Sequence, residues 1–248
     1  MIRYALILAA GLSKRIGKPK QLIIIDRYPL IWYPIAILHS LGVTEICVVT
    51  RDEIADPVKE TARRIMGRDP VRIIINDEPE KENGYSLLLG LKDCGFGDSM
   101  HYVSMSDHIY SPFIPARLMG FGSSSPYVIA GDKTPIFINV EEATKIISNG
   151  LQGYAVGKEL RYWSHIDSGV HLADPRKVLP VIRNSALLSQ DVLKLNDVTN
   201  YLGKIGELGV AEFSALPWTE VDTITDVSEL REGRRREVIK HVINWLHS

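Results

Sequence analysis

The chain has 248 residues, of which 45% are hydrophobic and 24% charged, and its formal net charge is -1. These values are ordinary for a globular protein with one large domain or two small ones. A near-neutral charge provides no basic field for nucleic acid, so no nucleic-acid partner is expected, and no run of about 18 apolar residues could span a membrane.

The N-terminal apolar run, residues 4–9, follows Arg3 and ends at a glycine and a basic loop. Its shortness is typical of a buried strand rather than of a signal peptide. Cys47 and Cys94 lack metal-ligand spacing and lie in apolar surroundings, so we expect two reduced core thiols. Reduced thiols fit a reducing cytoplasm, the expected location.

Strand-like and helix-like segments alternate through the first half of the chain. The apolar and β-branched runs predict strands over 4–9, 46–50, 71–75 and 101–105. Apolar periodicity predicts helices over 30–41, 54–66 and 84–91, the last with Asn83 as its N-cap. This alternation predicts βαβ units with right-handed crossovers, in which the loops after Ala9, Ile75 and Met105 share one ligand-binding rim.

The second half is less regular. Its pattern predicts strands over 127–130, 143–147, 166–172, 210–213 and 219–221, and helices over 178–182, 190–202 and 226–246. No linker rich in Gly, Ser or Pro divides the chain, which favours a single domain. The basic run Arg234–Arg236 is interpreted as a solvated helix face, with nucleic-acid or lipid contact as the alternative.

The first strand runs into a loop of small and cationic residues, LAAGLSKRIGKPK, between Leu8 and Lys20. Small side chains let a nucleotide approach the backbone, and Gly11 can turn successive N–H groups toward an anion. Four cations follow within seven positions, as a triphosphate requires: Lys14, Arg15, Lys18 and Lys20. The loop has neither the P-loop pattern nor the G-x-G-x-x-G pattern of NAD-dependent Rossmann enzymes.

Two further segments should reach the same rim. The sequence NDEPEKENGYSLLLGL, from Asn76, reads as an acidic loop followed by a helix whose N–H groups at Gly84 and Tyr85 point toward the strand ends. Asp107 closes the fourth predicted strand, and Mg²⁺ binds one or two carboxylates together with substrate phosphates. Asp107 is therefore a candidate metal ligand.

The glycine loop resembles the signature of the sugar-phosphate nucleotidyltransferases, L-A-A-G-x-G-x-R followed by P-K. The matching residues are Leu8, Ala9, Ala10, Gly11, Arg15, Pro19 and Lys20. Ser13 replaces the second glycine. The resemblance implies a GT-A-like α/β fold, a Rossmann-like mixed, mostly parallel sheet flanked by helices. It also implies that Arg15 contacts the outer phosphates and that Lys20 contacts the α-phosphate and the incoming phosphate.

The run EPEKENGYSLL is similar to a segment of the CTP:inositol-1-phosphate cytidylyltransferases of archaea and thermophiles. This branch of the family implies nucleotide contacts from Leu8, Ala9, Ala10, Gly11, Glu78, Gly84 and Ser86. It implies Mg²⁺ ligands at Asp107 and, from the late WTEVDT segment, at Asp222, with Asp226 as a rival that more typically caps a helix. From the segments ATKI, GKELR and DSG it implies acceptor contacts by Lys145, Lys158 and Asp167, with phosphate contact as the alternative for Lys145. From the SDH segment it implies an acceptor contact by His108, which could alternatively only orient a loop.

The expected reaction transfers a cytidylyl group from CTP to inositol 1-phosphate and yields CDP-inositol and pyrophosphate, with Arg15, Lys20 and Lys158 as catalytic cations. A sugar-1-phosphate or phosphocholine nucleotidyltransferase stays open, as does a catalytically silent nucleotide-binding regulatory subunit. Some relatives are fused to a membrane-bound transferase, so a separate membrane-bound phosphotransferase partner is expected. The same resemblance divides the domain into a nucleotide-binding half (1–125), an acceptor-binding half (126–225) and a C-terminal helix (226–248).

Overall fold

The structure is a computed structural model that describes residues 2–97, 99–121, 125–184, 187 and 191–248. The strands of its main sheet are β1 (Tyr4–Leu8), β4 (Glu45–Thr50), β5 (Val71–Ile75), β6 (His101–Met105), β8 (Tyr127–Asp132), β9 (Lys145–Asn149), β10 (Gln152–Gly157), β11 (His165–Ala173) and β12 (Leu208–Phe213). Two short pairs add β2 (Ile24–Ile25) with β3 (Tyr28–Pro29), and β7 (His108–Tyr110) with β13 (Trp218–Glu220).

The helices are α1 (Trp32–Ser40), α2 (Asp52–Met66), α3 (Glu82–Asp93), α4 (Phe113–Met119), α5 (Pro175–Asn184), α6 (Leu195–Lys204), α7 (Ile224–Arg231) and α8 (Arg236–Leu246). Two 3-10 turns, η1 (Lys20–Leu22) and η2 (Pro79–Lys81), follow the glycine loop and precede α3. Within the described residues, none of these helices is both long and apolar enough to cross a bilayer.

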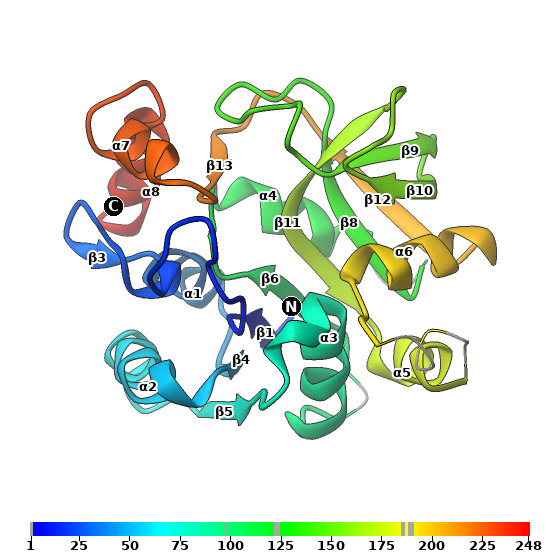
Figure 1. Cartoon of the computed structure of the whole chain (residues 1–248), viewed down its shortest axis with the longest axis horizontal. Coiled ribbons are helices and arrows are strands. Elements are labelled where there is room, and N and C mark those ends of the chain that lie inside the picture. Colours follow the sequence, from blue (N-terminus) through cyan, green and yellow to red (C-terminus); the bar gives the residue numbers. More distant parts are fainter. Residues whose placement is uncertain (1, 98, 122–124, 185–186, 188–190) are drawn as a thin grey trace.

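The main sheet is mixed, in the order β5-β4-β1-β6-β11-β8-β12-β10-β9 (Figure 1). The strands β5, β4, β1 and β6 pair in parallel, whereas β11 is antiparallel to β6 and β8. Because β9 also pairs with β11, the last five strands close into a ring. The β6–β11 pairing makes one continuous sheet of the two halves, as a single domain requires.

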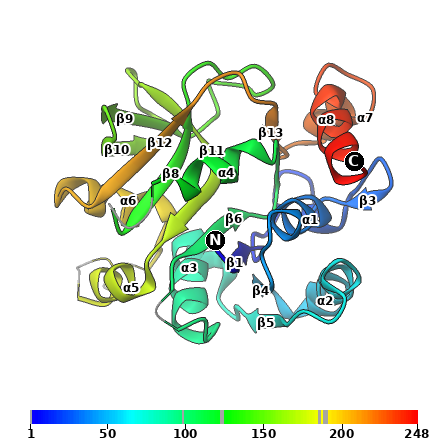
Figure 2. The same cartoon turned by 180° about the vertical axis from the view of Figure 1, so that it is seen from behind.

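Alternate residues of β1 face two separate cores. Ala5 and Ile7 pack into a cluster with α1 and α2, while Leu6 and Leu8 pack into a second cluster with α3. Figures 1 and 2 show α1 and α2 on one side of β1 and β4, and α3 on the other. Burial on both faces explains why β1 is a continuous apolar run.

Three predictions about the helices need correction. The helix predicted over 226–246 is two helices, because the chain turns at Gly233, where the Glu229 carboxylate accepts the Arg234 N–H at 3.2 Å. The helix predicted over 190–202 begins at Leu195, where Asp197 accepts the Lys194 N–H at 2.8 Å; residue 190 lies outside the described residues.

The third correction concerns Asn83, which does not cap α3. Helix α3 starts at Glu82, and the Asn83 side chain accepts the Leu195 N–H at 2.8 Å instead. It therefore ties α3 to α6. The strands β7 and β10 and the helix α4 were not predicted at all.

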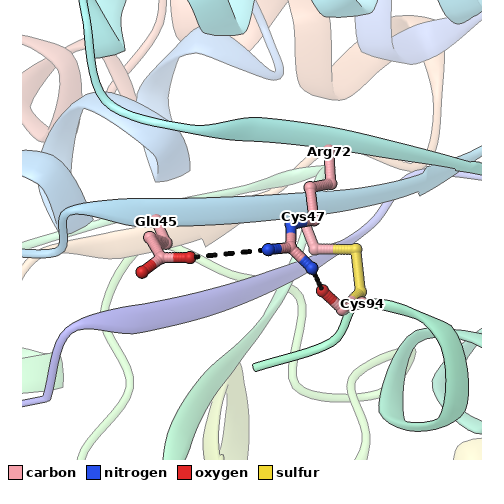
Figure 3. The surroundings of a disulfide bond; sticks show 4 residues. All are labelled: Glu45, Cys47, Arg72 and Cys94. Carbon is pink, nitrogen blue, oxygen red and sulfur yellow. Dashed lines mark hydrogen bonds and ion pairs between the residues drawn. A yellow bond between two sulfur atoms is a disulfide. The ribbon is translucent and has the colours of Figure 1, made fainter. Parts of the chain in front are cut away.

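The two cysteines form a disulfide, which overturns the prediction of reduced core thiols. Cys47 on β4 and Cys94 just after α3 face the same core cluster, with their Cα atoms 5.8 Å apart. That separation is within disulfide reach, so burial brought the thiols together rather than isolating them. Figure 3 shows the bond beside Arg72, which donates to the Cys94 carbonyl and lies 4.0 Å from Glu45.

Reduction of this disulfide should lower the melting temperature. The bond closes a loop with a sequence separation of 47, for which the chain-entropy model gives about 4 kcal/mol of stabilisation. We expect a reductant to lower the thermal midpoint of the wild-type protein and to leave that of the Cys47→Ala/Cys94→Ala variant unchanged. An unchanged midpoint in wild-type protein whose thiols are shown to be free by alkylation would contradict this prediction.

His101 should make stability depend on pH. Burial lowers its pKa from 6.5 to about 4, and Nε2 finds no partner among the described residues. Between pH 4 and pH 6.5 the ring is neutral in the folded protein but protonated in the unfolded chain. The free energy of unfolding is therefore unaffected above pH 6.5 and falls by roughly 3 kcal/mol as the pH drops to 4. Chemical denaturation across this range should show a shallower decline for His101→Phe than for wild type. The control His247→Gln, at an exposed histidine, should retain the wild-type decline.

Candidate nucleotide and phosphate site

A cavity of about 780 Å³ opens where β1 and β6 end. Leu8, Ala10 and Gly11 line it from the first strand and its loop, and Met105 and Asp107 line it from the end of β6 and the turn that follows. This is the rim predicted from the βαβ alternation, and the cavity volume is typical of a small-molecule site. Ala9 lies beneath the surface of the cavity, with its N–H bonded to the Val49 carbonyl.

Lys20, on the turn η1, lines the cavity. Its ammonium nitrogen lies 2.5 Å from Asp107 Oδ2 and 2.7 Å from Asp222 Oδ1. Burial alone would lower the pKa of Lys20, but the two carboxylates outweigh it and raise the pKa. The same partners hold Asp107 ionised: burial would raise the pKa of Asp107, and Lys20 and His108 together bring it well below its usual range.

Gln21 holds the glycine loop in place. Its amide nitrogen donates to the carbonyl of Ala9 at 2.9 Å and to that of Gly11 at 3.2 Å. The Lys20 N–H donates to the hydroxyl of Ser13, a residue with φ of 55°. The sequence did not predict this role of Gln21, because a single glutamine after a lysine belongs to no recognisable motif.

Asp222 is held by the start of α7. The Asp226 carboxylate accepts the N–H groups of Asp222 and Thr223 at 3.0 and 2.8 Å, and its other oxygen accepts from Arg235. Asp226 therefore acts in a capping box rather than as a metal ligand. Because Arg235 is bonded in this way, the run Arg234–Arg236 is not the wholly solvated face that was predicted.

Further cations surround Asp222. Arg15 lies 3.6 Å from Asp222 Oδ2 and 3.3 Å from Glu142, and Lys158 lies 3.9 Å from the same Asp222 oxygen. Arg15 and Lys158 are substantially exposed to solvent, so these contacts are weak and free to exchange for a phosphate. The predicted catalytic residues Arg15, Lys20 and Lys158 thus line one cavity.

His108 lines the cavity and lies between two carboxylates. Its Nδ1 is 2.7 Å from Asp107 Oδ1, and its Nε2 is 3.7 Å from Glu220. Burial would lower the pKa of His108, but Asp107 and Glu220 outweigh it and raise the pKa, while burial raises the pKa of Glu220. The direct contact between Nδ1 and Oδ1 means that His108 orients the Asp107 carboxylate.

The α3 side of the cavity differs from the prediction. Ser86 lines the cavity and accepts a hydrogen bond from Asn76, but Gly84 does not line it. A Cβ on Gly84 would lie 2.6 Å from the backbone of Lys194, so this glycine is needed for close packing. The predicted free N–H of Tyr85 donates to the Leu193 carbonyl at 3.1 Å.

Glu78 and Lys145 also lie off the cavity lining. Glu78 accepts from the Tyr85 hydroxyl and pairs with Lys81 at 2.6 Å. The buried ammonium of Lys145 donates to the carbonyls of Glu141 and Lys158, at 3.1 and 2.6 Å. Lys145 therefore holds the Lys158 backbone in place rather than facing a ligand. The second wall instead includes residues that were not predicted as contacts, although the first two lie within the ATKI and GKELR segments: Thr144, Glu159, Lys194, Asn196 and Asn200.

Comparison with known families identifies the first half of this architecture. Residues 5–130, just over half of the chain, match the MobA-like NTP transferase domain. The chain belongs to this family. The matched segment contains the glycine loop, Lys20 and Asp107, whereas Asp222 and Lys158 lie beyond it.

Relatives extend the match over most of the chain. It is 32% identical over 240 residues to the bifunctional IPC transferase and DIPP synthase of Thermococcus kodakarensis, covering 95% of this chain and 51% of the relative. With the protein of the same description from Archaeoglobus fulgidus it shares 29% over 229 residues, covering 90% and 42%. The chain thus spans about half the length of these relatives.

Solved structures confirm the nucleotidyltransferase fold. The inositol-1-phosphate CTP transferase from T. maritima superposes with a TM-score of 0.84 at 22% identity, covering 97% of this chain and 96% of that one. A UDP-glucose pyrophosphorylase superposes with a TM-score of 0.77 at 15% identity, covering 97% and 99%. At these identities the likeness establishes the fold, which is the predicted GT-A-like α/β fold.

The two aspartates are suited to a divalent cation. Across the described residues, no group of three or more His, Cys, Asp and Glu could form a complete protein metal site. However, Asp107 and Asp222 converge on a single ammonium nitrogen, and two carboxylates are what Mg²⁺ needs when phosphates supply further ligands. The residues therefore fit Mg²⁺ bound partly by substrate phosphates, and they do not fit a metal whose ligands all come from the protein.

Removing the Lys20 charge should destabilise the fold. Lys20→Met leaves two partly buried carboxylates without their shared partner, for which a loss of about 3–5 kcal/mol is expected. The added substitution Asp107→Asn should recover a large part of that loss, and Lys18→Met, at an exposed lysine, should cost less than about 0.5 kcal/mol. Urea denaturation of the variants measures their free energies of unfolding and checks this ranking. Equal stability of Lys20→Met and Lys18→Met would show that the ion triad contributes nothing.

Proposed function

We propose that this chain transfers a cytidylyl group from CTP to inositol 1-phosphate and releases pyrophosphate. The observation that carries the proposal is the position of Lys20 between Asp107 and Asp222, with Arg15 and Lys158 beside them, in a cavity at the strand ends. The choice of substrates is supported by the inositol-1-phosphate CTP transferase of the same fold and by the sequence relatives.

The reaction needs charge neutralisation more than proton transfer. The second pKa of a phosphate monoester is about 6, so the acceptor phosphate is already a nucleophile at neutral pH. The obstacle is the repulsion between this dianion and the triphosphate. Arg15 and Lys20 would neutralise the triphosphate, and Lys158 would hold the acceptor phosphate in line with the α-phosphorus.

His108 is not assigned as a general base. Its Nδ1 is engaged by Asp107, and no proton has to leave the acceptor phosphate. It orients the Asp107 carboxylate instead. Asp107 and Asp222 would hold Mg²⁺, which, when bound, supplies positive charge to the phosphate oxygens and the departing pyrophosphate.

The nucleoside would occupy the side of the cavity formed by Leu8, Ala10, Gly11 and Ser86, and the acceptor would lie near Lys158 and Asp167. Gly84, Glu78, Ala9 and Lys145 support this arrangement from behind the cavity surface. A membrane-bound phosphotransferase that consumes the product remains a prediction.

Substitutions of the ion triad should abolish most turnover. Lys20→Ala or Asp107→Ala should lower kcat/KM by on the order of 10²-fold or more, because each removes a charge that acts on the transition state. Pyrophosphate release measures the rate. Lys18→Ala is the matched control. Lys18 was predicted as one of the four triphosphate cations, but it lies outside the cavity lining, so this variant should retain wild-type rates. An Asp107→Ala protein with wild-type turnover would refute the metal assignment.

A substrate panel separates this function from its rivals. The purified chain would be incubated with Mg²⁺, each of the four NTPs, and inositol 1-phosphate, glucose 1-phosphate or phosphocholine. We expect pyrophosphate release to be greatest with CTP and inositol 1-phosphate. A preference for another pair would identify another nucleotidyltransferase, and a folded protein inactive with every pair would favour the regulatory-subunit alternative.

A further inference from the structure

A buried chain of hydrogen bonds supports Asp167 from behind the cavity. The Tyr127 hydroxyl on β8 lies 2.7 Å from Nδ1 of His171 on β11, and Nε2 of His171 lies 2.8 Å from Asp167 Oδ1. Tyr127 and His171 are 0% and 1% exposed, so neither can touch a ligand. None of the phosphate chemistry above uses them.

A bulge in β11 makes this contact possible. Asp167 and His171 are four residues apart, a distance of about 13 Å in a regular strand. The register between β11 and β8 shifts between these two residues, and Gly169 adopts a φ of +74°. A Cβ at Gly169 would lie 2.4 Å from the His108 ring, so only glycine fits. Bulges of this kind redirect side chains beside binding sites.

The hydrogen bonds leave one Asp167 oxygen available. Oδ1 accepts from His171 Nε2 and from the Gly169 N–H, the latter at 2.8 Å. A carboxylate only accepts, so Nε2 of His171 carries the proton whether or not the ring is charged. No donor from the described part of the chain reaches Oδ2, and the Asp167 side chain, 10% exposed, lines the cavity.

We propose that His171 and Tyr127 are positioning residues, which lock Asp167 so that Oδ2 accepts a hydrogen bond from one hydroxyl of a phosphorylated polyol acceptor. This inference rests on the proposed function. The argument is geometric: two donors on Oδ1 fix the rotamer, and Tyr127 fixes the imidazole. A buried acceptor aimed at one hydroxyl rejects an analogue that lacks that hydroxyl, because its own hydrogen bond is then lost.

Kinetics of three variants test this chain of hydrogen bonds from Tyr127 through His171 to Asp167, here called the Tyr127–His171–Asp167 relay. His171→Leu removes the donor to Asp167 and should raise KM for the polyol phosphate by about 10-fold or more while KM for CTP changes little. His171→Gln can place an amide N–H near the position of Nε2 and should restore most of the affinity. Tyr127→Phe should give an intermediate effect. Melting temperatures of the three variants establish that each is folded.

Monodeoxy acceptors locate the hydroxyl. For one analogue in a series of monodeoxy inositol phosphates, wild type and His171→Leu should have the same kcat/KM, because the bond that the relay supports is absent from both. Two results would show that the positioning role is wrong. One is a lower kcat/KM for His171→Leu than for wild type with every analogue. The other is a rise in KM for CTP as large as the rise in KM for the polyol phosphate. An inactive wild-type enzyme with every polyol phosphate would instead overturn the proposed function.

A measurement that needs no activity tests the same relay. Nitrogen-15 NMR of the imidazole groups, with His171 assigned from the signal missing in His171→Gln, should show a protonated Nε2. A His171 ring protonated at Nδ1 alone would overturn the proposal, because Asp167 Oδ1 would then lack its donor.

Discussion

The site depends on one ammonium group held between two carboxylates. The Lys20 ammonium bonds both to Asp107, just after β6, and to Asp222, which is 115 positions later in the chain. Without this cation the two negative charges would repel each other at close range in partly buried surroundings. The same charges suit the proposed reaction between polyanions, in which Lys20 would neutralise phosphate charge and the two aspartates would hold a divalent cation.

Each member of this triad is fixed by its own support. Gln21 binds the carbonyls of Ala9 and Gly11 at the start of the glycine loop, His108 holds Asp107, and Asp226 with Arg235 holds the segment of Asp222. These supports come from distant parts of the chain. They explain how a site made of flexible, charged side chains can be organised before substrate arrives.

The sequence predicted the parallel part of the sheet closely because burial on both faces leaves a continuous apolar run, as in β1 and β4. It also placed Lys20, Asp107 and Asp222 in one site, through motifs rather than through spacing. It failed where a residue's role depends on distant packing. Gly84 is needed for close packing against the Lys194 backbone, and Lys145 donates to two backbone carbonyls. The two cysteines, from different elements, form a disulfide. Local sequence does not predict these contacts.

The most direct test of the account is a crystal structure of the protein with CTP and Mn²⁺ as an anomalous scatterer. The account predicts a single strong anomalous peak between the carboxylates of Asp107 and Asp222, with the Lys20 ammonium moved onto a phosphate oxygen. A peak that touches neither aspartate, or a Lys20 that still bridges both of them beside bound CTP, would contradict it.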